Sequence, residues 1–462
     1  LTHSQERSFL HVLDHSLTLL WGPPGTGKTH FLAMTILILL EAHRRAGLPL
    51  RVLVTGFTHT AIENCLLKLG DLRAKTGIAA EMAKLERVYD ERAVELEVVE
   101  PYRAVDYLDV HPLCVLGGTT YAVQKMFKDM PDDRPFDLVV VDEGSQLRVA
   151  ESLLALSRLA PGGRLVVAGD DLQLPPIVRG VYPEPEPGEP LLHRSLFEAL
   201  REPDRGREAI TCQLYENFRM NESLTRFPAE LLYGTQYRSA TTAVAGRRLS
   251  LAGTGRMPAW ARWAIDPEYP LVLCVLEGVQ AGAQNQVEAG LVAELVRVLR
   301  RRQCRSEGGK PYPDGAEGDR EFWRQGLCIV SPHHVQIRAI KQALADRGLN
   351  PPYFVDTVDK MQGQECDTVL VSYGVADPET ALQEGEFIYS LNRLNVAITR
   401  ARRKCIVFLP RPLLTPSLEV LELPDAAAGI GFMLGLERFV VEQGESERFL
   451  VPGGELLVHR TR

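Results

Sequence analysis

The sequence predicts an α/β protein with two lobes, each built around a parallel sheet that helices cover on both faces. Three observations support this fold class. Short unbroken apolar segments alternate with helical patterns, the alternation pauses at a proline- and glutamate-rich segment at 179–190, and a second series then follows. Unbroken apolar strands are typical of parallel sheets that are buried on both faces. For 462 residues, a prior of about 150 residues per domain allows two to four domains.

The first lobe is expected to span residues 1–190. Its apolar strand segments are too short for helices and are flanked by turn-forming or charged residues. A charged stretch with a helical pattern at 73–109 predicts a small helical insertion, and the segment at 179–190 is expected to be a loop. The expected strands are 17–21, 51–55, 113–116, 138–141 and 165–168, and the expected helices are 28–45 and about 60–69.

The second lobe is expected to span 191–412, with the two lobes joined near 190–212. Residues 413–462 are then a C-terminal extension of unknown role. An irregular segment is expected at 238–263 and a surface loop at 306–324. The expected strands are 271–276, 327–330, 368–372 and 405–409, and the expected helices are 286–302, about 334–346 and 390–403.

The composition is that of a globular protein. Hydrophobic residues make up 45% of the chain and charged residues 24%, which suffices for sizeable cores and argues against a disordered chain. The net charge of −8 supplies no overall positive field, which argues mildly against a nucleic-acid-binding protein. A local basic groove would still suffice to bind phosphates, so the class of ligand stays open at this level.

The cysteines and the apolar segments indicate the compartment. Eight cysteines are scattered singly from Cys65 to Cys405 without a C-x-x-C pair, which argues against a zinc site and suits a reducing cytoplasm. The longest apolar run, near 31–40, is shorter than the roughly 20 residues of a membrane span. We therefore expect a cytoplasmic protein with no signal peptide and no membrane partner. The chain begins at Leu1 inside a nucleotide-site motif, so we expect a fragment of a longer protein.

A glycine-rich motif of the form G-x-x-x-x-G-K-[ST] lies between a predicted strand and a predicted helix. Its glycines allow backbone N–H groups to turn toward a phosphate, and the helix N-terminus adds partial positive charge. Lys28 is expected to reach the β- and γ-phosphates of ATP, and the Thr29 hydroxyl to ligate Mg²⁺. The alternative, a glycine-rich turn with an incidental lysine, is disfavoured by the flanking strand and helix. The motif comprises Gly22, Pro23, Pro24, Gly25, Thr26, Gly27, Lys28 and Thr29.

Two acidic residues follow the apolar strand at 138–141. The C-terminal ends of strands are where ligands bind in open α/β sheets. Asp142 is expected to hold Mg²⁺ through water, and Glu143 to polarise the attacking water as general base. An apolar run that ends in acids is weak by itself, because many strands end in solvated carboxylates. The phosphate loop 114 positions upstream (142 minus 28) strengthens the interpretation.

Several segments resemble, in order, the motifs of superfamily 1 helicases, in the branch that contains the nonsense-mediated-decay helicase and the replication nuclease-helicase. Three residues depart from the family pattern: Thr2 stands where Asn is frequent, Asn217 where Gln is, and Phe218 where Tyr is. The resemblance covers about 1–409 and implies two tandem RecA-like P-loop domains that bind ATP. The segments are LTHSQ (1–5), VDEGSQ (141–146), GDDLQLPP (169–176), NFRM (217–220), VDTVDKMQGQE (355–365) and RLNVAITRAR (393–402).

The resemblance also implies nucleotide contacts outside the phosphate loop. Arg219 and Arg400 would be arginine fingers from the second lobe, which suits a guanidinium because it stays charged and presents a rigid fork of donors. The alternative for Arg400 is a solvated arginine at a helix end, since its basic neighbours fit the same description. The other implied contacts are Gln5 as the adenine reader, Phe218 stacked on adenine, Gln173 sensing the γ-phosphate or positioning water, and Glu365 touching the nucleotide.

The resemblance further implies a strand-binding surface of small polar side chains, which can donate to phosphate oxygens without reading sequence. Each contact is weak alone, because threonine pairs after strands usually cap helices and His333 and His334 fit surface or capping positions. His333 stands where the family has Tyr, and its ring could still stack on a base. The arginine run at 297–305 is interpreted as the solvated end of a helix rather than as a basic patch. The implied contacts are Thr58, His59, Thr119, Thr120, Pro332, His333, Thr357 and Lys360.

Together these inferences predict an enzyme that hydrolyses ATP with Mg²⁺, moves along single-stranded nucleic acid and unwinds duplexes. The resemblance implies 5′-to-3′ movement, favours DNA over RNA, and suggests a fused or associated nuclease domain outside this chain. One alternative is a nucleic-acid-stimulated ATPase clamp or remodeller that does not separate strands. Another is a binding module that has lost catalysis, which is disfavoured because the expected catalytic residues are all present.

Overall fold

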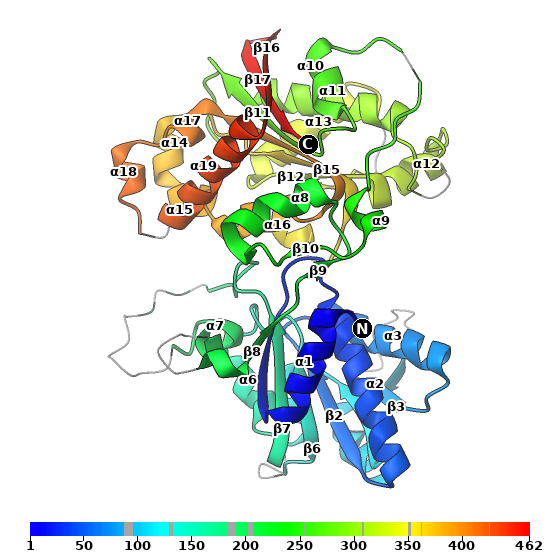
Figure 1. Cartoon of the computed structure of the whole chain (residues 1–462). Helices are drawn as coiled ribbons and strands as arrows, with labels where there is room; N and C mark the ends of the chain where they lie inside the picture. Colours follow the sequence, from blue (N-terminus) through cyan, green and yellow to red (C-terminus); the bar gives the residue numbers. More distant parts are fainter. Residues whose placement is uncertain are drawn as a thin grey trace. The chain divides into compact units, whose positions relative to one another are not determined.

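The computed structural model divides the chain into two compact units, Leu1–Glu216 and Asn217–Arg462, and each unit contains its own sheet (Figure 1). The division lies beyond the predicted boundary at 190/191, because a late strand, β8 (Thr211–Gln213), pairs with β1 (Leu17–Trp21) in the first sheet. The structure describes residues 1–86, 96–128, 133–178, 180, 182, 191–201, 207–253, 255–306, 309–349, 353–361, 363–424 and 426–462. The loop predicted at 179–190 therefore lies almost wholly outside the described residues.

In the first unit, neighbouring strands of the sheet all run parallel, in the order β4-β3-β5-β2-β6-β7-β1-β8. Successive side chains point to opposite faces, so Leu19 and Leu20 of β1 pack into different core clusters. All the predicted strands of this lobe are present. The strands besides β1 and β8 are β2 (Leu50–Thr55), β3 (Glu81–Leu85), β4 (Glu97–Val99), β5 (Leu113–Gly117), β6 (Phe136–Val141) and β7 (Leu159–Gly169).

Helices cover both faces of this sheet. The first three helices supply Val12, Phe31 and Ile62 to one core cluster, and later helices supply Leu108 and Val123 to the other. The helices are α1 (His3–Asp14), α2 (Lys28–Ala46), α3 (His59–Thr76), η1 (Pro101–Arg103), α4 (Ala104–Val110), α5 (Thr120–Met126), α6 (Val149–Leu156), α7 (Leu196–Arg201) and η3 (Arg207–Ile210).

The prediction of a helical insertion at 73–109 is wrong for part of that segment. The end of α3, the short η1 and α4 are helical, but β3 and β4 extend the parallel sheet between them. Their segments, EMAKL and EVV, mix charged with apolar residues, so hydrophobic periodicity did not reveal them. Residues 87–95 of the segment lie outside the described part of the chain.

In the second unit, the sheet has the order β13-β12-β14-β15-β11-β17-β16. The strands from β13 to β11 run parallel, and β17 is antiparallel to both β11 and β16. Residues 413–462, predicted as a separate extension, instead complete this sheet with a C-terminal hairpin. The strands are β11 (Leu271–Glu277), β12 (Leu327–Val330), β13 (Val355–Asp356), β14 (Cys366–Ser372), β15 (Ala401–Pro410), β16 (Gly444–Val451) and β17 (Gly454–Thr461), and β9 (Glu216–Asn217) pairs separately with β10 (Arg238–Ser239).

The helices of the second unit correct two further predictions. The helix expected at 390–403 ends at Ile398, and β15 begins at Ala401 because its first residue pairs with Cys366. The segments at 238–263 and 306–324, predicted as irregular, contain short helices. The helices are α8 (Glu222–Pro228), η4 (Ala229–Tyr233), α9 (Thr242–Ala245), α10 (Ala259–Ile265), α11 (Gln286–Arg302), α12 (Ala316–Glu321), η5 (Phe322–Gly326), α13 (His334–Ala345), η6 (Val358–Met361), α14 (Pro378–Gln383), α15 (Gly385–Ile388), α16 (Leu391–Ile398), α17 (Arg411–Leu414), α18 (Leu418–Leu421) and α19 (Ala427–Glu442).

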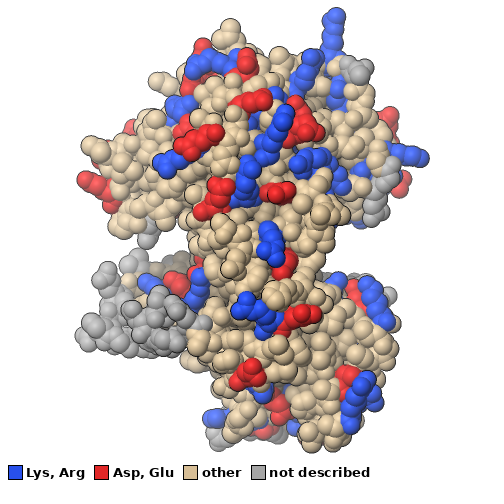
Figure 2. Space-filling model, in the orientation of Figure 1, with Lys and Arg blue, Asp and Glu red and all other residues tan. Residues whose placement is uncertain are grey.

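The surface carries both signs of charge. On the face drawn in Figure 2, basic and acidic side chains are interspersed and form no continuous basic tract. Within the described ranges, no helix combines the length and the apolar character that crossing a membrane requires.

Candidate nucleotide-binding site

The phosphate-loop motif forms a tight turn between β1 and α2. Gly25 and Gly27 have φ angles of 75° and 76°, in the left-handed region that only glycine enters without strain. Thr26 closes the turn, since its N–H and its hydroxyl both donate to the Pro23 carbonyl, at 3.3 and 2.8 Å. Gly22 is required for space: a Cβ there would lie 2.1 Å from Cγ of Lys28. The turn therefore directs the open N-terminus of α2 toward whatever occupies the loop.

Lys28 and Thr29 begin α2 and point back over the turn. The Lys28 ammonium donates to the Gly22 carbonyl, and the Thr29 hydroxyl donates to Oδ2 of Asp142 at 3.0 Å. Asp142 follows β6, and its N–H bonds to Thr55 at the end of β2. The structure thus brings the phosphate loop next to the predicted acidic pair.

The acidic pair has unusual electrostatics and geometry. Asp142 is buried, and burial together with the neighbouring Glu143 raises the pKa of Asp142 to about 6, although Lys28 and Thr29 oppose the shift. Glu143 has a φ of 53°, the only positive φ at a non-glycine position among the described residues. Its N–H donates to Oδ1 of Asp142 at 2.9 Å. Backbone strain of this kind collects at functional sites, because surrounding contacts must hold it in place.

Gln173 lies in the loop that follows β7, the strand paired with β1. Its amide nitrogen donates to Oδ2 of Asp170 at 2.7 Å, and both side chains are buried. Asp170 also accepts the indole N–H of Trp21 at 3.1 Å, which ties this loop to the strand that leads into the phosphate loop. Asp170 thus acts as a positioning residue, which was not predicted from the sequence. Its place directly after an apolar strand, like that of Asp142, was the available signal.

Gln5 lies against the phosphate loop from α1. It is the third residue of a capping box with Thr2, whose N–H donates to Oε1 of Gln5 at 3.1 Å. Its amide nitrogen donates to the Thr26 carbonyl at 3.4 Å. A buried carboxylate that the sequence analysis missed, Glu216, accepts from the hydroxyls of Thr2 and Ser4. Burial would raise the pKa of Glu216, but these hydrogen bonds hold it below its ordinary value.

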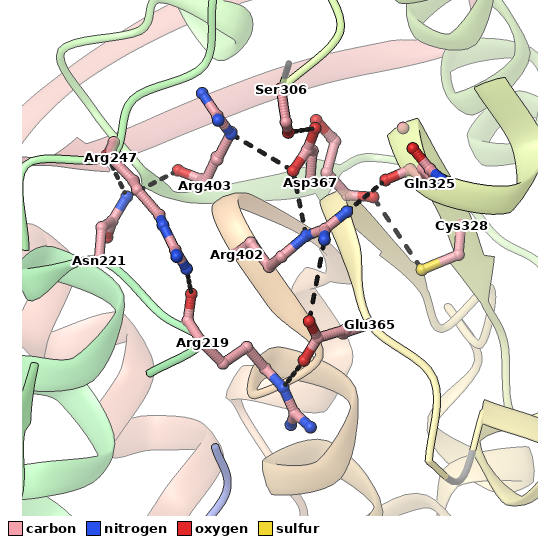
Figure 3. A network of polar contacts seen from close by, with 12 residues as sticks. Arg219, Asn221, Arg247, Ser306, Gln325, Cys328, Glu365, Asp367, Arg402 and Arg403 are labelled. Atoms are coloured by element: carbon pink, nitrogen blue, oxygen red, sulfur yellow. Dashed lines mark hydrogen bonds and ion pairs between the residues drawn. The ribbon is translucent and has the colours of Figure 1, made fainter. Parts of the chain in front are cut away.

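In the second unit, Arg219 is oriented by an acidic and a carbonyl acceptor. Its Nε donates to Oε2 of Glu365 at 2.6 Å (Figure 3). Its Nη1 donates to the Thr399 carbonyl at 3.0 Å. Burial would raise the pKa of Glu365, but Arg219 and Arg402 hold it below its ordinary value. Arg247 fixes the backbone, since its guanidinium donates to the carbonyls of Phe218 and Arg219, both at 2.9 Å.

Arg400 and Phe218 lie in the same unit with opposite exposures. Arg400 is only 4% exposed, between α16 and β15, so the alternative of a solvated arginine at a helix end is wrong. Its carbonyl accepts the N–H of Cys366, the residue after Glu365. Phe218 is 40% exposed, as a side chain that stacks on a ligand must be. The second unit thus gathers Arg219, Glu365 and the segment ending in Arg400.

Three of the predicted strand contacts of the first unit, His59, Thr119 and Thr120, line an open pocket of about 580 Å³. Thr58 and Thr119 are the N-caps of α3 and α5, so the capping alternative holds for both. His59 lies 3.9 Å from the carboxylate of Glu86. The residues lining the pocket include His59, Thr119, Thr120, Phe57, Tyr121 and Lys125.

The predicted strand contacts of the second unit are more enclosed. His333 is buried, its Nε2 lies 2.5 Å from Oε2 of Glu384, and its ring meets that of Phe387 edge-on. Because only 9% of His333 is exposed, its ring offers little surface on which a base could stack, and the stacking role remains a prediction. Pro332 and Thr357 line a small apolar pocket, and Lys360 is exposed on η6.

Comparisons with known proteins show which class of protein the chain is similar to. Residues 5–179 and 192–409 each match a family model described as an AAA domain. With the phosphate loop, these matches define a P-loop ATPase of two RecA-like domains, which confirms the predicted fold class. More narrowly, the order of the motifs resembles the superfamily 1 helicases, and the relatives support the branch that contains the replication nuclease-helicase.

The relatives that the chain resembles are named as DNA replication proteins. The chain is 28% identical over 436 residues to the DNA replication ATP-dependent helicase/nuclease DNA2 of Homo sapiens, covering 89% of this chain and 37% of that protein. It is 26% identical to the Xenopus laevis protein of the same name over 418 residues, 86% of this chain and 36% of that one. The Schizosaccharomyces pombe protein is 26% identical over 436 residues, 86% of this chain and 27% of that one. The chain thus spans about a third of the length of these relatives.

Proposed function

We propose that this chain is the ATP-hydrolysing motor of a DNA helicase that moves along single-stranded DNA from 5′ to 3′. The observation that carries the proposal is the convergence of a phosphate loop, the Thr29 hydroxyl and the Asp142–Glu143 pair at one end of the first sheet. The relatives are named as DNA replication helicase/nucleases, which supports DNA as the strand, and the resemblance to the helicase branch supports the polarity. Such a protein acts inside the cell, where its substrate is.

The first unit would bind the triphosphate and activate water. Lys28 exchanges the Gly22 carbonyl for the β- and γ-phosphate oxygens, and Gln5 contacts adenine. The hydroxyl of Thr29 and the carboxylate of Asp142 are 3.0 Å apart and are the oxygen donors that Mg²⁺ prefers, so these residues fit the ion. When bound, Mg²⁺ supplies neutralising charge for the phosphates. Glu143 accepts the proton of the attacking water, and Gln173 helps to orient that water.

The second unit would supply positive charge for the transition state. Hydrolysis builds negative charge on the γ-phosphate oxygens, and catalysis is mainly the stabilisation of that charge. Arg219 and Arg400 would act there as arginine fingers, Phe218 would stack on adenine, and Glu365 would contact the nucleotide. Stronger contact with ATP than with its products would make the two units alternate between arrangements, which converts hydrolysis into movement.

The strand would cross the pocket of the first unit. Its open lining combines hydroxyls, the cationic Lys125 and the exposed rings of Phe57 and Tyr121. Such a surface binds backbone phosphates and stacks bases without reading sequence. Pro332, Thr357 and Lys360 would contribute from the second unit. A nuclease domain, fused or associated, would lie outside this chain, as the names of its relatives suggest.

The first experiment measures steady-state ATP hydrolysis with and without single strands. We expect oligo-dT to stimulate the rate, and poly-U to stimulate it less. Glu143→Gln should abolish turnover while ATP binding persists, since the amide cannot accept the proton but keeps the size of the side chain. Turnover that no single strand stimulates would remove the motor, and unchanged turnover in Glu143→Gln would overturn the assigned base.

The alternative is an ATPase clamp or remodeller that binds the strand without separating duplexes. The replaced stacking position at His333 favours it, because the second unit then lacks one hold on the bases. A forked duplex with a 5′ single-stranded tail distinguishes the two functions. Strand separation that requires ATP supports the helicase, and strand-stimulated hydrolysis without separation supports the clamp.

A further inference from the structure

Two carboxylates flank the first residue of β14 and are held by arginines from separate segments of the second unit (Figure 3). Asp367 is the inner one, with a side chain only 1% exposed. Its Oδ1 lies 3.1 Å from Nε of Arg402 and 3.3 Å from Nε of Arg403, and its Oδ2 accepts the Ser306 hydroxyl. Two guanidiniums and a hydroxyl thus surround a buried carboxyl group, as a polar group removed from water requires.

Arg402 connects this buried carboxylate to the outer one. Besides its contact with Asp367, its Nη1 lies 3.8 Å from Oε1 of Glu365, and its Nη2 donates to the Gln325 carbonyl at 3.1 Å. The planar guanidinium is therefore fixed on several sides. Glu365 in turn uses its other oxygen, Oε2, to accept from Arg219.

This series of contacts ends at the guanidinium of Arg219, which still has N–H groups that can donate to a ligand. Arg219 uses Nε for Glu365 and Nη1 for Thr399, and Nη2 contacts no acceptor among the described residues. Two of the three nitrogens thus hold the guanidinium in place, and the N–H groups of Nη2 can meet a phosphate oxygen. Anchoring of this kind fixes where the positive charge is presented, and a displacement of about 1 Å can cost roughly 10²-fold in rate.

We infer that Asp367 is a positioning residue for ATP hydrolysis, because it fixes Arg402 and thereby keeps Glu365 committed to Arg219. The inference rests on the proposed function, in which Arg219 is an arginine finger. Without the Asp367 charge, Arg402 and Arg403 lose their shared counter-ion. The two guanidiniums then repel each other, and Arg402 gives up the contact with Oε1 of Glu365 that leaves Oε2 for Arg219. Positive charge is already crowded here: burial, and then Arg403 and Arg402, lower the pKa of Arg247.

The test compares Asp367→Asn in two backgrounds of the full chain, with saturating oligo-dT. In the wild-type background we expect kcat to fall roughly 10- to 100-fold with KM for ATP nearly unchanged, because a finger acts mainly in the transition state. In an Arg219→Ala background, Asp367→Asn should reduce kcat no further, since the residue that it positions is gone. Equal losses in both backgrounds, or an unchanged kcat in a folded variant, would overturn the inference.

A second variant decides the case if Asp367→Asn does not fold. Arg402→Gln removes the connecting guanidinium from a position that is 24% exposed, and the same kcat loss and the same lack of additivity with Arg219→Ala are expected. Arg411→Gln is the matched control, because Arg411 also pairs with two carboxylates, Glu277 and Glu437, but outside this network. If kcat falls in Arg219→Ala but not in Arg402→Gln, the positioning role of Asp367 is refuted and the proposed function is not. A wild-type chain that does not hydrolyse ATP would instead refute the proposed function.

Discussion

Two glutamates at opposite ends of the second sheet have opposite ionisation behaviour. Glu365 precedes β14, and its arginine neighbours hold its pKa below the ordinary value. Glu288, in the first turn of α11, contacts the other end of the strand: its Oε1 accepts the Ser372 hydroxyl at 2.6 Å and the Gly374 N–H at 2.9 Å. No basic side chain among the described residues pairs with it, and burial raises the pKa of Glu288 to about 8.

The difference between Glu365 and Glu288 shows that a buried carboxyl group favours its ionised form only where basic side chains lie beside it. At the Glu288 end, the neutral carboxyl joins a network of uncharged groups, since Asn285 and Gln336 bond to each other and Gln336 reaches Ser372. Such a network fixes loops relative to one another. At the other end, the guanidiniums of Arg219 and Arg402 favour the ionised form of Glu365, and Arg219 keeps Nη2 available for a ligand. The four predictions below test whether only the charged end acts in catalysis.

The largest expected effect is that of Arg219→Ala. Removing an arginine finger should lower kcat for ATP by about 10³-fold or more, while the affinity for ATP changes little. Steady-state hydrolysis and binding of a fluorescent ATP analogue measure the two quantities. A variant that keeps more than half of the wild-type kcat would show that the charged end does not serve catalysis.

Glu288→Ala should affect stability instead. It leaves the Ser372 hydroxyl and the Gly374 N–H without their acceptor inside the protein and opens a cavity, so the free energy of unfolding should fall by about 2–4 kcal/mol. Urea denaturation of the full chain measures the change. At a temperature where the variant is folded, its kcat should match that of the wild type. A loss of kcat without a loss of stability would show that the Glu288 end of the sheet also acts in catalysis.

Glu288→Gln should change how stability depends on pH. The raised pKa means that the folded chain holds a proton that the unfolded chain releases near pH 4.5, so the stabilisation is complete below that pH and is lost as the pH rises through about 8. The amide of the variant cannot ionise, so its Tm lacks this loss. Between pH 5 and about pH 9, the Tm of the wild type should therefore fall relative to the Tm of the variant. Burial lowers the pKa of Lys404 to about 7, but this contribution is common to both proteins. Parallel Tm curves would mean that Glu288 is ionised.

The smallest effect is expected for Arg297→Gln. Arg297 lies on α11, outside the proposed catalytic residues, and serves as a control. Arg297 pairs with Glu294 at 2.6 Å and remains one-third exposed, and surface pairs contribute roughly 0–1 kcal/mol. We expect an unchanged kcat and a change in unfolding free energy within about 0.5 kcal/mol. A larger loss of strand-stimulated turnover would revive the basic-patch interpretation of the run at 297–305.

The sequence predicted what depends on local pattern. The phosphate loop and the strands near 17–21 and 271–276 follow from spacing and from unbroken apolar runs. Strand β16, in contrast, has the sequence GESERFLV and lies at the sheet edge with mostly exposed side chains, so hydropathy gave no signal for it. The helix expected at 390–403 stops early because β15 must pair with β14 from Ala401 onward, and tertiary pairing overrides local propensity.

The candidate site shows the same limit. Arg219, Glu365 and Arg400 could be found because each stands in a motif that resembles a family. Asp367 and Arg247 could not, since their roles arise only where distant segments meet around β14 and β15. The burial of His333 could not be foreseen either, because Glu384 and Phe387 reach it from a different segment.

The hydrogen bonds of Glu216 have a mechanical consequence. The chain leaves the first unit at this residue, and the bonds to Thr2 and Ser4 lie nearer the exit than the pairing of β8 with β1. Tension on the chain beyond Glu216 is therefore borne first by the start of α1. The same helix carries Gln5, whose amide nitrogen donates to the Thr26 carbonyl. A force applied to the chain after Glu216 would therefore act on the phosphate loop before it acts on the pairing of β8 with β1.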